Sequence, residues 1–362
     1  MNRKEIENWL ISLKSDILKF ISRINENNFY HYSLSGDIYP LTTKWGLGNA
    51  VFASKIYYML NELTPERKQV LSNFIKSFQN KQGYINDPLV LRLSSVKRIY
   101  LALRNLYFKN LFGKATMRAE TRQAFAALSC LNNRPDLPFL HIPYTESEIE
   151  KFINTLNWKQ PWSACSHVSH LLFFLKINKT FFNIHYQSAE DLIQFVIKYV
   201  NLKYRQKDGS WYDSLSALPH YEKVNAAMKM MTGYDAVKWR EIGQEHKLID
   251  LCLSAINEGH ACNHFNVICV LYHCCKETDY KINEIHQYCL QQLEHYRQYY
   301  WPETGGFSFF KGKASHSYYN AILSKGLREP DIHGTVLFLW GIVLVTKILK
   351  YDHIIELQPP IT

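Results

Sequence analysis

Apolar residues recur at intervals of three and four along most of the chain, which is the period of an amphipathic helix. Near the N-terminus, Ile6, Leu10, Leu13 and Ile17 form one such stripe. The alternation of single apolar and polar residues that is typical of strands is scarce. The pattern therefore predicts an all-α chain.

Two kinds of predicted helix alternate along the sequence. Residues 189–204 and 282–299 carry charge on one face, whereas residues 164–175 and 334–349 are apolar nearly all round. A helix with one apolar stripe buries one face, and a helix that is apolar on all sides is enclosed. The alternation predicts an outer layer of amphipathic helices around an inner layer of apolar helices.

Six short breaks separate these helices, and most of them follow one another at intervals of roughly 47 to 50 residues. One interval is longer, about 76 residues, and holds an extra helical segment near 96–112. Six helix pairs predict a single domain over residues 1–362, an (α/α)6 toroid of about twelve helices with long loops at one end. An open helical solenoid has the same repeat and is the alternative. The breaks are Ser35-Gly36-Asp37, Gln82-Gly83-Tyr84, Lys159-Gln160-Pro161-Trp162, Asp208-Gly209-Ser210-Trp211, Glu258-Gly259-His260 and Gly305-Gly306-Phe307.

Three of the breaks carry related sequences. Residues 205–211 read Arg-Gln-Lys-Asp-Gly-Ser-Trp and resemble the Q-x-x-D-G-S-W repeat of squalene-type cyclases, shortened by one residue. Residues 78–84 and 300–307 resemble the looser repeat that these cyclases share with protein prenyltransferases. The resemblance implies the toroid fold and an enzyme related to isoprenoid cyclases or prenyltransferases. In each repeat the glycine supplies a tight turn, and the aromatic residue packs back between helices.

Polar residues stand near the start of every inner helix, where a toroid opens on its central cavity and where free N–H groups favour anions. We expect Asn225, His260, Asn263 and His333 to meet in a single pocket that lines this cavity. The candidate catalytic residues are His333, Asp331, His260 and Glu222. The candidate substrate-binding residues are Asn225, Asn263, Lys229, Trp211, Tyr319 and Arg122.

Among these helix starts, the segment Asp331 to Gly334 gives the most specific indication of a catalytic site. Histidine is the natural general acid or base near neutral pH, and Asp331 could orient the imidazole of His333. The alternative is that Asp331 caps the helix and His333 packs. Gly334 would let another backbone or a ligand come close to the helix.

Glu222, Asn225 and Lys229 follow one another at i, i+3 and i+7, so they share one face of a predicted helix. A carboxylate, an amide and an amine on one face suit a polar ligand. A buried ion-pair network with Lys229 is the alternative.

The sequence contains residues typical of a zinc site, but their spacing does not favour one. Asp250 and Cys252 look like the Asp-x-Cys zinc ligands of protein prenyltransferases, and His333 looks like the distant histidine. Asp250 and Cys252, however, fall on different faces of an outer helix. A site formed by His260, His264 and His333 is less favoured still. We therefore expect no metal and no cofactor.

The eight cysteines contain no C-x-x-C pair, and the N-terminal residues do not read as a secretory signal. This usage predicts reduced, buried thiols in a cytoplasmic protein. No apolar stretch approaches 18 residues, so no transmembrane segment is expected.

Lysine and arginine number 42 and aspartate and glutamate 32, which gives a formal net charge of +10. The basic residues are scattered, so no nucleic-acid partner is expected. The charge suits a small-molecule or glycan substrate that is anionic, and it is compatible with peripheral contact with an anionic membrane.

Three functions remain open. Aromatic residues make up 14% of the chain and could stabilise isoprenoid cations, so an isoprenoid enzyme with His/Asp acid–base chemistry leads. The D-x-D-D and D-D-x-x-D motifs of terpene enzymes are absent. The first alternative is a carbohydrate-active lyase, hydrolase or epimerase that acts on an acidic sugar. The second is a toroid that binds without catalysis.

Overall fold

The computed structural model describes residues 3–104, 110, 112–185, 188–255 and 259–362. These residues form fourteen helices and two small antiparallel sheets of two strands each. The prediction of an all-α fold is confirmed. Among the described residues, no helix is long and apolar enough to cross a membrane.

The chain divides into two compact units. The first unit comprises residues 1–137, 293–343 and 351–361, and the second comprises residues 138–292, 344–350 and 362. The prediction of one domain over 1–362, like the closure of the helices into a ring, stays a prediction. Each unit is described below by itself.

The first unit contains the inner helix α2 (Leu47–Met59), which is buried nearly all round. Helix α2 packs against α6 (Lys114–Cys130), and α3 (Pro65–Lys76) contacts both. The sheets join β1 (Asn25–Glu26) to β2 (Phe29–Tyr30) and β3 (Ser317–Tyr318) to β4 (Ala321–Ile322). The remaining helices of this unit are α1 (Arg3–Arg23), α4 (Pro88–Leu93), α5 (Ser95–Arg104) and most of α14 (Ile332–Ile348).

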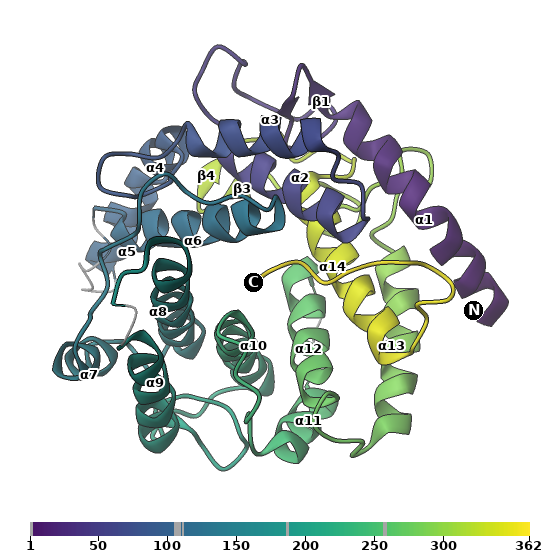
Figure 1. The fold of residues 1–362 in the computed structure, drawn as a ribbon. Coiled ribbons are helices and arrows are strands. Elements are labelled where there is room, and N and C mark those ends of the chain that lie inside the picture. The colour runs from purple at the N-terminus through teal and green to yellow at the C-terminus, as the bar shows by residue number, and fades with distance from the viewer. Residues whose placement is uncertain (1–2, 105–109, 111, 186–187, 256–258) are drawn as a thin grey trace. The chain divides into compact units, whose positions relative to one another are not determined.

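The second unit has three apolar helices in a row: α10 (His220–Ala236) packs against α8 (Pro161–Phe182) on one side and α12 (Ala261–Cys274) on the other (Figure 1). Amphipathic helices cover this row. Helix α9 (Ala189–Tyr204) packs on α8, and α11 (Glu245–Ser254) packs on α10 and α12. The unit also contains α7 (Glu146–Asn154) and the first part of α13 (Ile282–Arg297). The alternation of enclosed and half-buried helices that the sequence predicts is thus present here.

The three related breaks adopt the same local structure. Each has a glycine in the left-handed region, closes with a short antiparallel bridge, and buries its aromatic residue. This bears out the structural role expected for glycine and the aromatic residue in the repeat. The glycines are Gly83, Gly209 and Gly305, the bridges are Gln79 with Ile85, Arg205 with Trp211 and Tyr300 with Phe307, and the aromatic residues are Tyr84, Trp211 and Phe307.

Candidate functional site

His333 lies in the first turn of α14, within a group of aromatic rings of the first unit. Its imidazole stacks on Phe52 of α2, with ring centroids 4.8 Å apart and planes at 10°, and the ring of Phe309 lies at 4.7 Å. The Nδ1 atom lies 3.2 Å from the hydroxyl oxygen of Tyr32. Tyr318 presents its ring at 6.0 Å, nearly perpendicular to the imidazole. The half-buried imidazole therefore sits in an aromatic environment with one phenol in hydrogen-bond reach.

Asp331 caps α14. One carboxylate oxygen accepts the backbone N–H of Gly334 at 2.7 Å, and the other accepts those of Phe309 at 2.8 Å and Ser315 at 3.0 Å. Burial raises the pKa of the Asp331 carboxyl to about 7, and these N–H groups oppose the rise. Of its two expected roles, capping is the one for which the structure supplies the partners.

Gly334 lets another part of the backbone lie close to α14, as the sequence predicts. A Cβ atom here would overlap the backbone of Ser308 and Phe309. The glycine lets this loop lie directly against α14, so that the ring of Phe309 reaches the imidazole of His333. The site therefore depends on a position that only glycine can occupy without displacing the loop.

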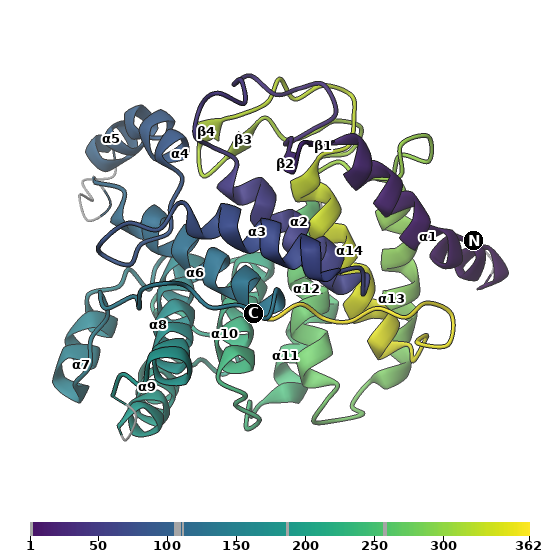
Figure 2. The same ribbon diagram turned by 45° about the horizontal axis from the view of Figure 1, so that its top comes forward.

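The β3–β4 hairpin of the first unit, labelled in Figure 2, carries Tyr318 in β3 and Tyr319 in its turn. Its central residues, Tyr319 and Asn320, have φ angles of 45° and 66°, which are the positive values of a type I′ turn. A bulky residue such as tyrosine is uncommon in this region. Tyr318 packs on Gly48 of α2, where a Cβ atom would lie 2.8 Å from its ring. Backbone strain of this kind is found preferentially at functional sites.

Glu120 of α6 is a buried acid beside these tyrosines. It is 2% exposed, and its Oε2 accepts the backbone N–H of Asp87 at 3.2 Å. Among the described residues, its Oε1 has no hydrogen-bond partner. Burial, followed by repulsion from the carboxylate of Asp87, raises the pKa of Glu120 well above its usual range. The environment thus favours the neutral carboxylic acid form of Glu120, in which Oε1 makes no hydrogen bond among the described residues.

Asp87 holds the starts of two helices and positions Glu120. Its Oδ2 accepts the N–H groups of Gly46 and Leu47 at the start of α2, and its Oδ1 accepts those of Leu89 and Val90 in α4. The sequence reasoning missed this residue. An aspartate directly before a proline that opens a helix was the available signal.

Electrostatic effects link the tyrosines to α6. Burial raises the pKa of both tyrosines, and the charge of Glu120 adds to the rise. Arg122, also buried, lowers the pKa of Tyr319. Two expected binding residues, Tyr319 and Arg122, are thus near each other.

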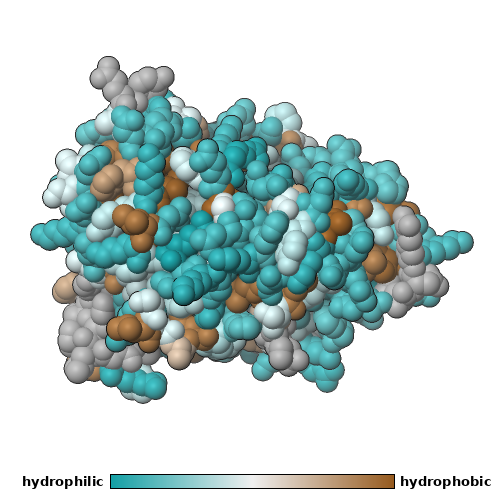
Figure 3. Space-filling view, turned by 90° about the horizontal axis from the view of Figure 1, so that it is seen from below, coloured by the Kyte–Doolittle hydropathy of each residue, from teal (hydrophilic) through white to brown (hydrophobic). Residues whose placement is uncertain are grey.

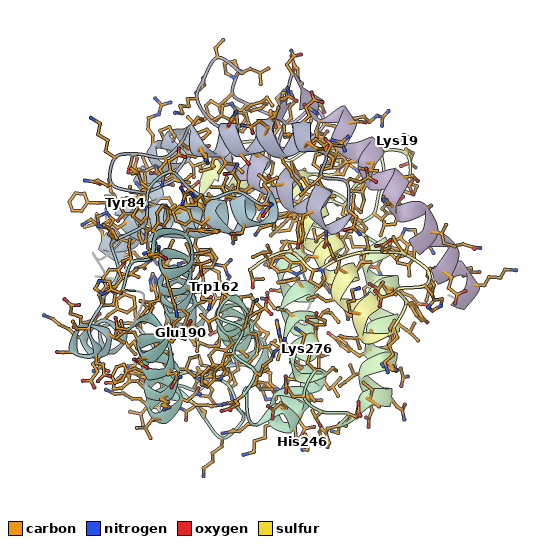
Figure 4. The ribbon with its side chains drawn as sticks, viewed as in Figure 1. Lys19, Tyr84, Trp162, Glu190, His246 and Lys276 are labelled. Atoms are coloured by element: carbon orange, nitrogen blue, oxygen red, sulfur yellow. The ribbon has the colours of Figure 1, made fainter. Side chains whose placement is uncertain are left out.

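The other candidates lie in the second unit. Asn225 of α10 accepts a hydrogen bond of 2.6 Å from Asn266 of α12, so the two helices are joined by an amide pair. The ammonium of Lys229 lies 5.1 Å from the ring centre of Trp162, which is half-exposed at the start of α8 (Figure 4). Glu222 accepts a hydrogen bond from the hydroxyl of Tyr221 at 3.3 Å.

His260 and Asn263 meet at the start of α12, where the backbone N–H of Asn263 donates to the carbonyl of His260 at 3.0 Å. Burial lowers the pKa of the His260 imidazole. Asn225, His260 and Asn263 belong to the second unit and His333 to the first, so the single pocket expected from these four stays a prediction.

Trp211 is fully buried in the second unit. Its indole N–H donates to Asn201 at 2.8 Å, and the guanidinium of Arg205 lies 4.6 Å from its ring centre. This placement is that of the packing aromatic in the repeat, and it leaves the ring enclosed rather than presented to a substrate.

The residues considered for zinc have other surroundings. Asp250 forms an ion pair of 2.6 Å with Lys281, whereas the thiol of Cys252 is buried and its pKa is raised by that burial. Within the described part of the chain, no three histidine, cysteine, aspartate or glutamate residues are grouped so as to hold a metal ion.

No known protein family matches this sequence, and no characterised protein is significantly similar to it. The case for a function therefore rests on the geometry described above.

Proposed function

We propose that the chain is an enzyme that protonates an apolar, isoprenoid-type substrate, with Glu120 as the acid. The observation that carries this proposal is the Glu120 carboxyl, which is buried, has a raised pKa and keeps Oε1 without a partner among the described residues. A carboxylic acid held neutral in an apolar site can donate a proton at neutral pH.

The reaction follows from the chemistry of such an acid. The Glu120 proton would pass to one carbon of a C=C bond, leaving a carbocation on the other carbon and a carboxylate on Glu120. The aromatic rings that surround His333, those of Phe52, Phe309 and Tyr318, would stabilise the cation. His333, among these rings, would accept the proton that the cation loses when the product forms.

Two further features support this proposal. The three glycine–aromatic turns, which share one geometry, resemble the repeats of isoprenoid enzymes. Arg122, buried near Tyr319, offers a cation for an anionic end of a substrate. With Glu120 as the proton donor, the reaction does not require the aspartate of a D-x-D-D motif, which this sequence lacks.

The test is an activity screen with farnesyl diphosphate, geranylgeranyl diphosphate and squalene, read by gas chromatography and mass spectrometry. Glu120→Gln should lower the rate by on the order of 10²-fold or more, as loss of a general acid does. His333→Ala should lower it similarly and should leave the fold intact. Glu356→Gln, an exposed change in the same unit, should leave the rate unchanged. Full activity in Glu120→Gln would overturn the assigned acid.

A carbohydrate-active function is the second candidate, favoured by Trp162 and Lys229. A half-exposed indole beside an ammonium suits the face of a sugar ring that carries a carboxylate. Binding of oligouronates, measured by calorimetry, should then weaken at least tenfold in Trp162→Ala. Binding that the substitution does not change would remove this candidate.

The eight cysteines are free thiols, and six of them are buried. This supports the proposal of a cytoplasmic location, where thiols stay reduced.

A further inference from the structure

Helix α5 presents its apolar side to solvent. Val96, Ile99, Tyr100 and Leu103 follow one another at i, i+3, i+4 and i+7 and form one stripe. All four are exposed, Val96 to 75% and Leu103 to 61%. One flank of the stripe is turned inward at Ala102, which is buried. Helices of this kind normally bury the apolar stripe, so α5 is inverted with respect to the usual pattern.

The stripe is a continuous row of apolar side chains on one helix. The face of the molecule drawn in Figure 3 is mostly hydrophilic, with hydrophobic residues scattered over it. Single exposed apolar residues are normal, whereas four in register on one helix mark an interaction site. Phe112, exposed a short distance along the chain, adds a fifth apolar side chain to this region.

Positive charge accompanies the stripe. Residues 88–119 contain seven lysines and arginines and no aspartate or glutamate. On a helix of 100° per residue, Lys97 and Arg104 fall beside the edge of the stripe, and both are exposed. Arg92 and Lys114, on neighbouring elements, are exposed as well.

We infer that α5 docks on an anionic phospholipid membrane and lies in its interface. The apolar stripe would enter the boundary between headgroups and acyl chains, while Lys97 and Arg104 meet the lipid phosphates. The helix has 10 residues and is too short to span a bilayer, so it can only lie along the surface. A nucleic acid would use the charges and leave the stripe exposed to water.

This inference is independent of the proposed function, because it concerns another surface of the first unit and needs no substrate. It is tested by sedimentation of the full chain with vesicles of phosphatidylcholine alone or mixed with phosphatidylserine. The chain should bind the mixed vesicles, bind the neutral ones at least tenfold more weakly, and be released from the mixed ones by salt.

Two double variants separate the two contributions. Ile99→Gln with Leu103→Gln should weaken binding to the mixed vesicles at least tenfold. Lys97→Gln with Arg104→Gln should weaken it about 25-fold, since each basic residue contributes about fivefold. The matched control is Leu202→Gln with Leu215→Gln, which changes two nearly fully exposed leucines of the second unit.

The inference would be overturned by no binding to the mixed vesicles, by equal binding to neutral vesicles, or by equal loss in the control variant. Circular dichroism of each variant shows that the helices are intact. A change of molecular mass in solution caused by the stripe variants, without a change in vesicle binding, would assign the stripe to a protein partner and also overturn the inference.

Discussion

At the scale of the residue, the buried carboxyls of the first unit carry the most consequential chemistry. The carboxylate oxygens of Asp331 and Asp87 accept hydrogen bonds from backbone N–H groups, so both residues hold loops and helix starts in place. Glu120 differs, since its Oε1 accepts no hydrogen bond within the described residues. A buried carboxyl group is therefore structural at two positions and a candidate acid at the third.

Glu120 should make the protein less stable as pH rises. Its pKa is raised on folding, so the folded state binds more protons than the unfolded state above about pH 4.5, and the free energy of unfolding falls with pH. Glu120→Gln removes this titration and keeps an acceptor for the Asp87 N–H. The variant should match the wild type near pH 4 and exceed its stability increasingly toward pH 8.

Urea unfolding at a series of pH values measures this difference, and Glu356→Gln controls for the substitution itself. A stability difference between Glu120→Gln and the wild type that shrinks as pH rises would contradict the assigned direction of the shift. Infrared difference spectroscopy gives a second readout, because the C=O stretch of a protonated carboxyl should disappear in the variant.

Asp331→Ala should destabilise the first unit by about 3 kcal/mol or more. It removes a helix cap, which is worth about 1 kcal/mol, and leaves two buried N–H groups unpaired at about 1–3 kcal/mol each. The midpoint of urea unfolding measures the loss. A change below about 1 kcal/mol would mean that the N–H groups of Phe309 and Ser315 find other acceptors.

At the scale of the element, the chain repeats a small turn whose conformation requires glycine. Sequence alone was enough to locate these turns and to assign their glycines and aromatic residues, because both roles are local. It was also enough to separate enclosed from amphipathic helices. The β3–β4 hairpin was not foreseen, since Tyr319 at a positive φ gives no glycine signal.

Gly209→Ala should cost more than Gly312→Ala, although both glycines have positive φ. At Gly312 a Cβ atom would meet nothing within 4 Å, so only the backbone cost of about 1–2 kcal/mol applies. At Gly209 it would lie 3.0 Å from Leu248 and 3.3 Å from the carbonyl of Gln244. Thermal unfolding of both variants measures the loss of stability. Equal losses would show that α11 moves to accommodate the added Cβ atom at little cost.

At the scale of the whole molecule, the residues predicted for one site are divided between the two units. The polar residues at inner-helix starts pointed to His333, Asp331 and Arg122, and the aromatic content of the loops pointed to Tyr319; all four lie in the first unit. It also included Trp211, which is enclosed, because a sequence does not distinguish an aromatic that packs from one that binds. Tyr32 and Asp87 were missed, since their roles arise from contacts between segments far apart in the chain.

The cysteines should be inert in the folded protein. Burial raises the pKa of Cys130, Cys262 and Cys275 to about 11, and thiols in that state are rarely the reactive thiolate. Titration with Ellman's reagent at pH 8 should label few thiols within minutes in native protein and all eight in denaturant. Prompt labelling of most thiols in the native protein would show that the helices around them open readily.

The first unit is built from both ends of the chain, and this has a consequence for synthesis on the ribosome. The backbone N–H of Ile332 donates to the carbonyl of Tyr32, and Asp331 bridges to Ser33, so the N-terminal segment gains these partners only after some three hundred further residues are made. Residues 138–292 form most of the second unit and wait only for the short segments 344–350 and 362. We therefore expect most of the second unit to fold first, while the segment around Tyr32 depends on the later synthesis of the segment around Ile332.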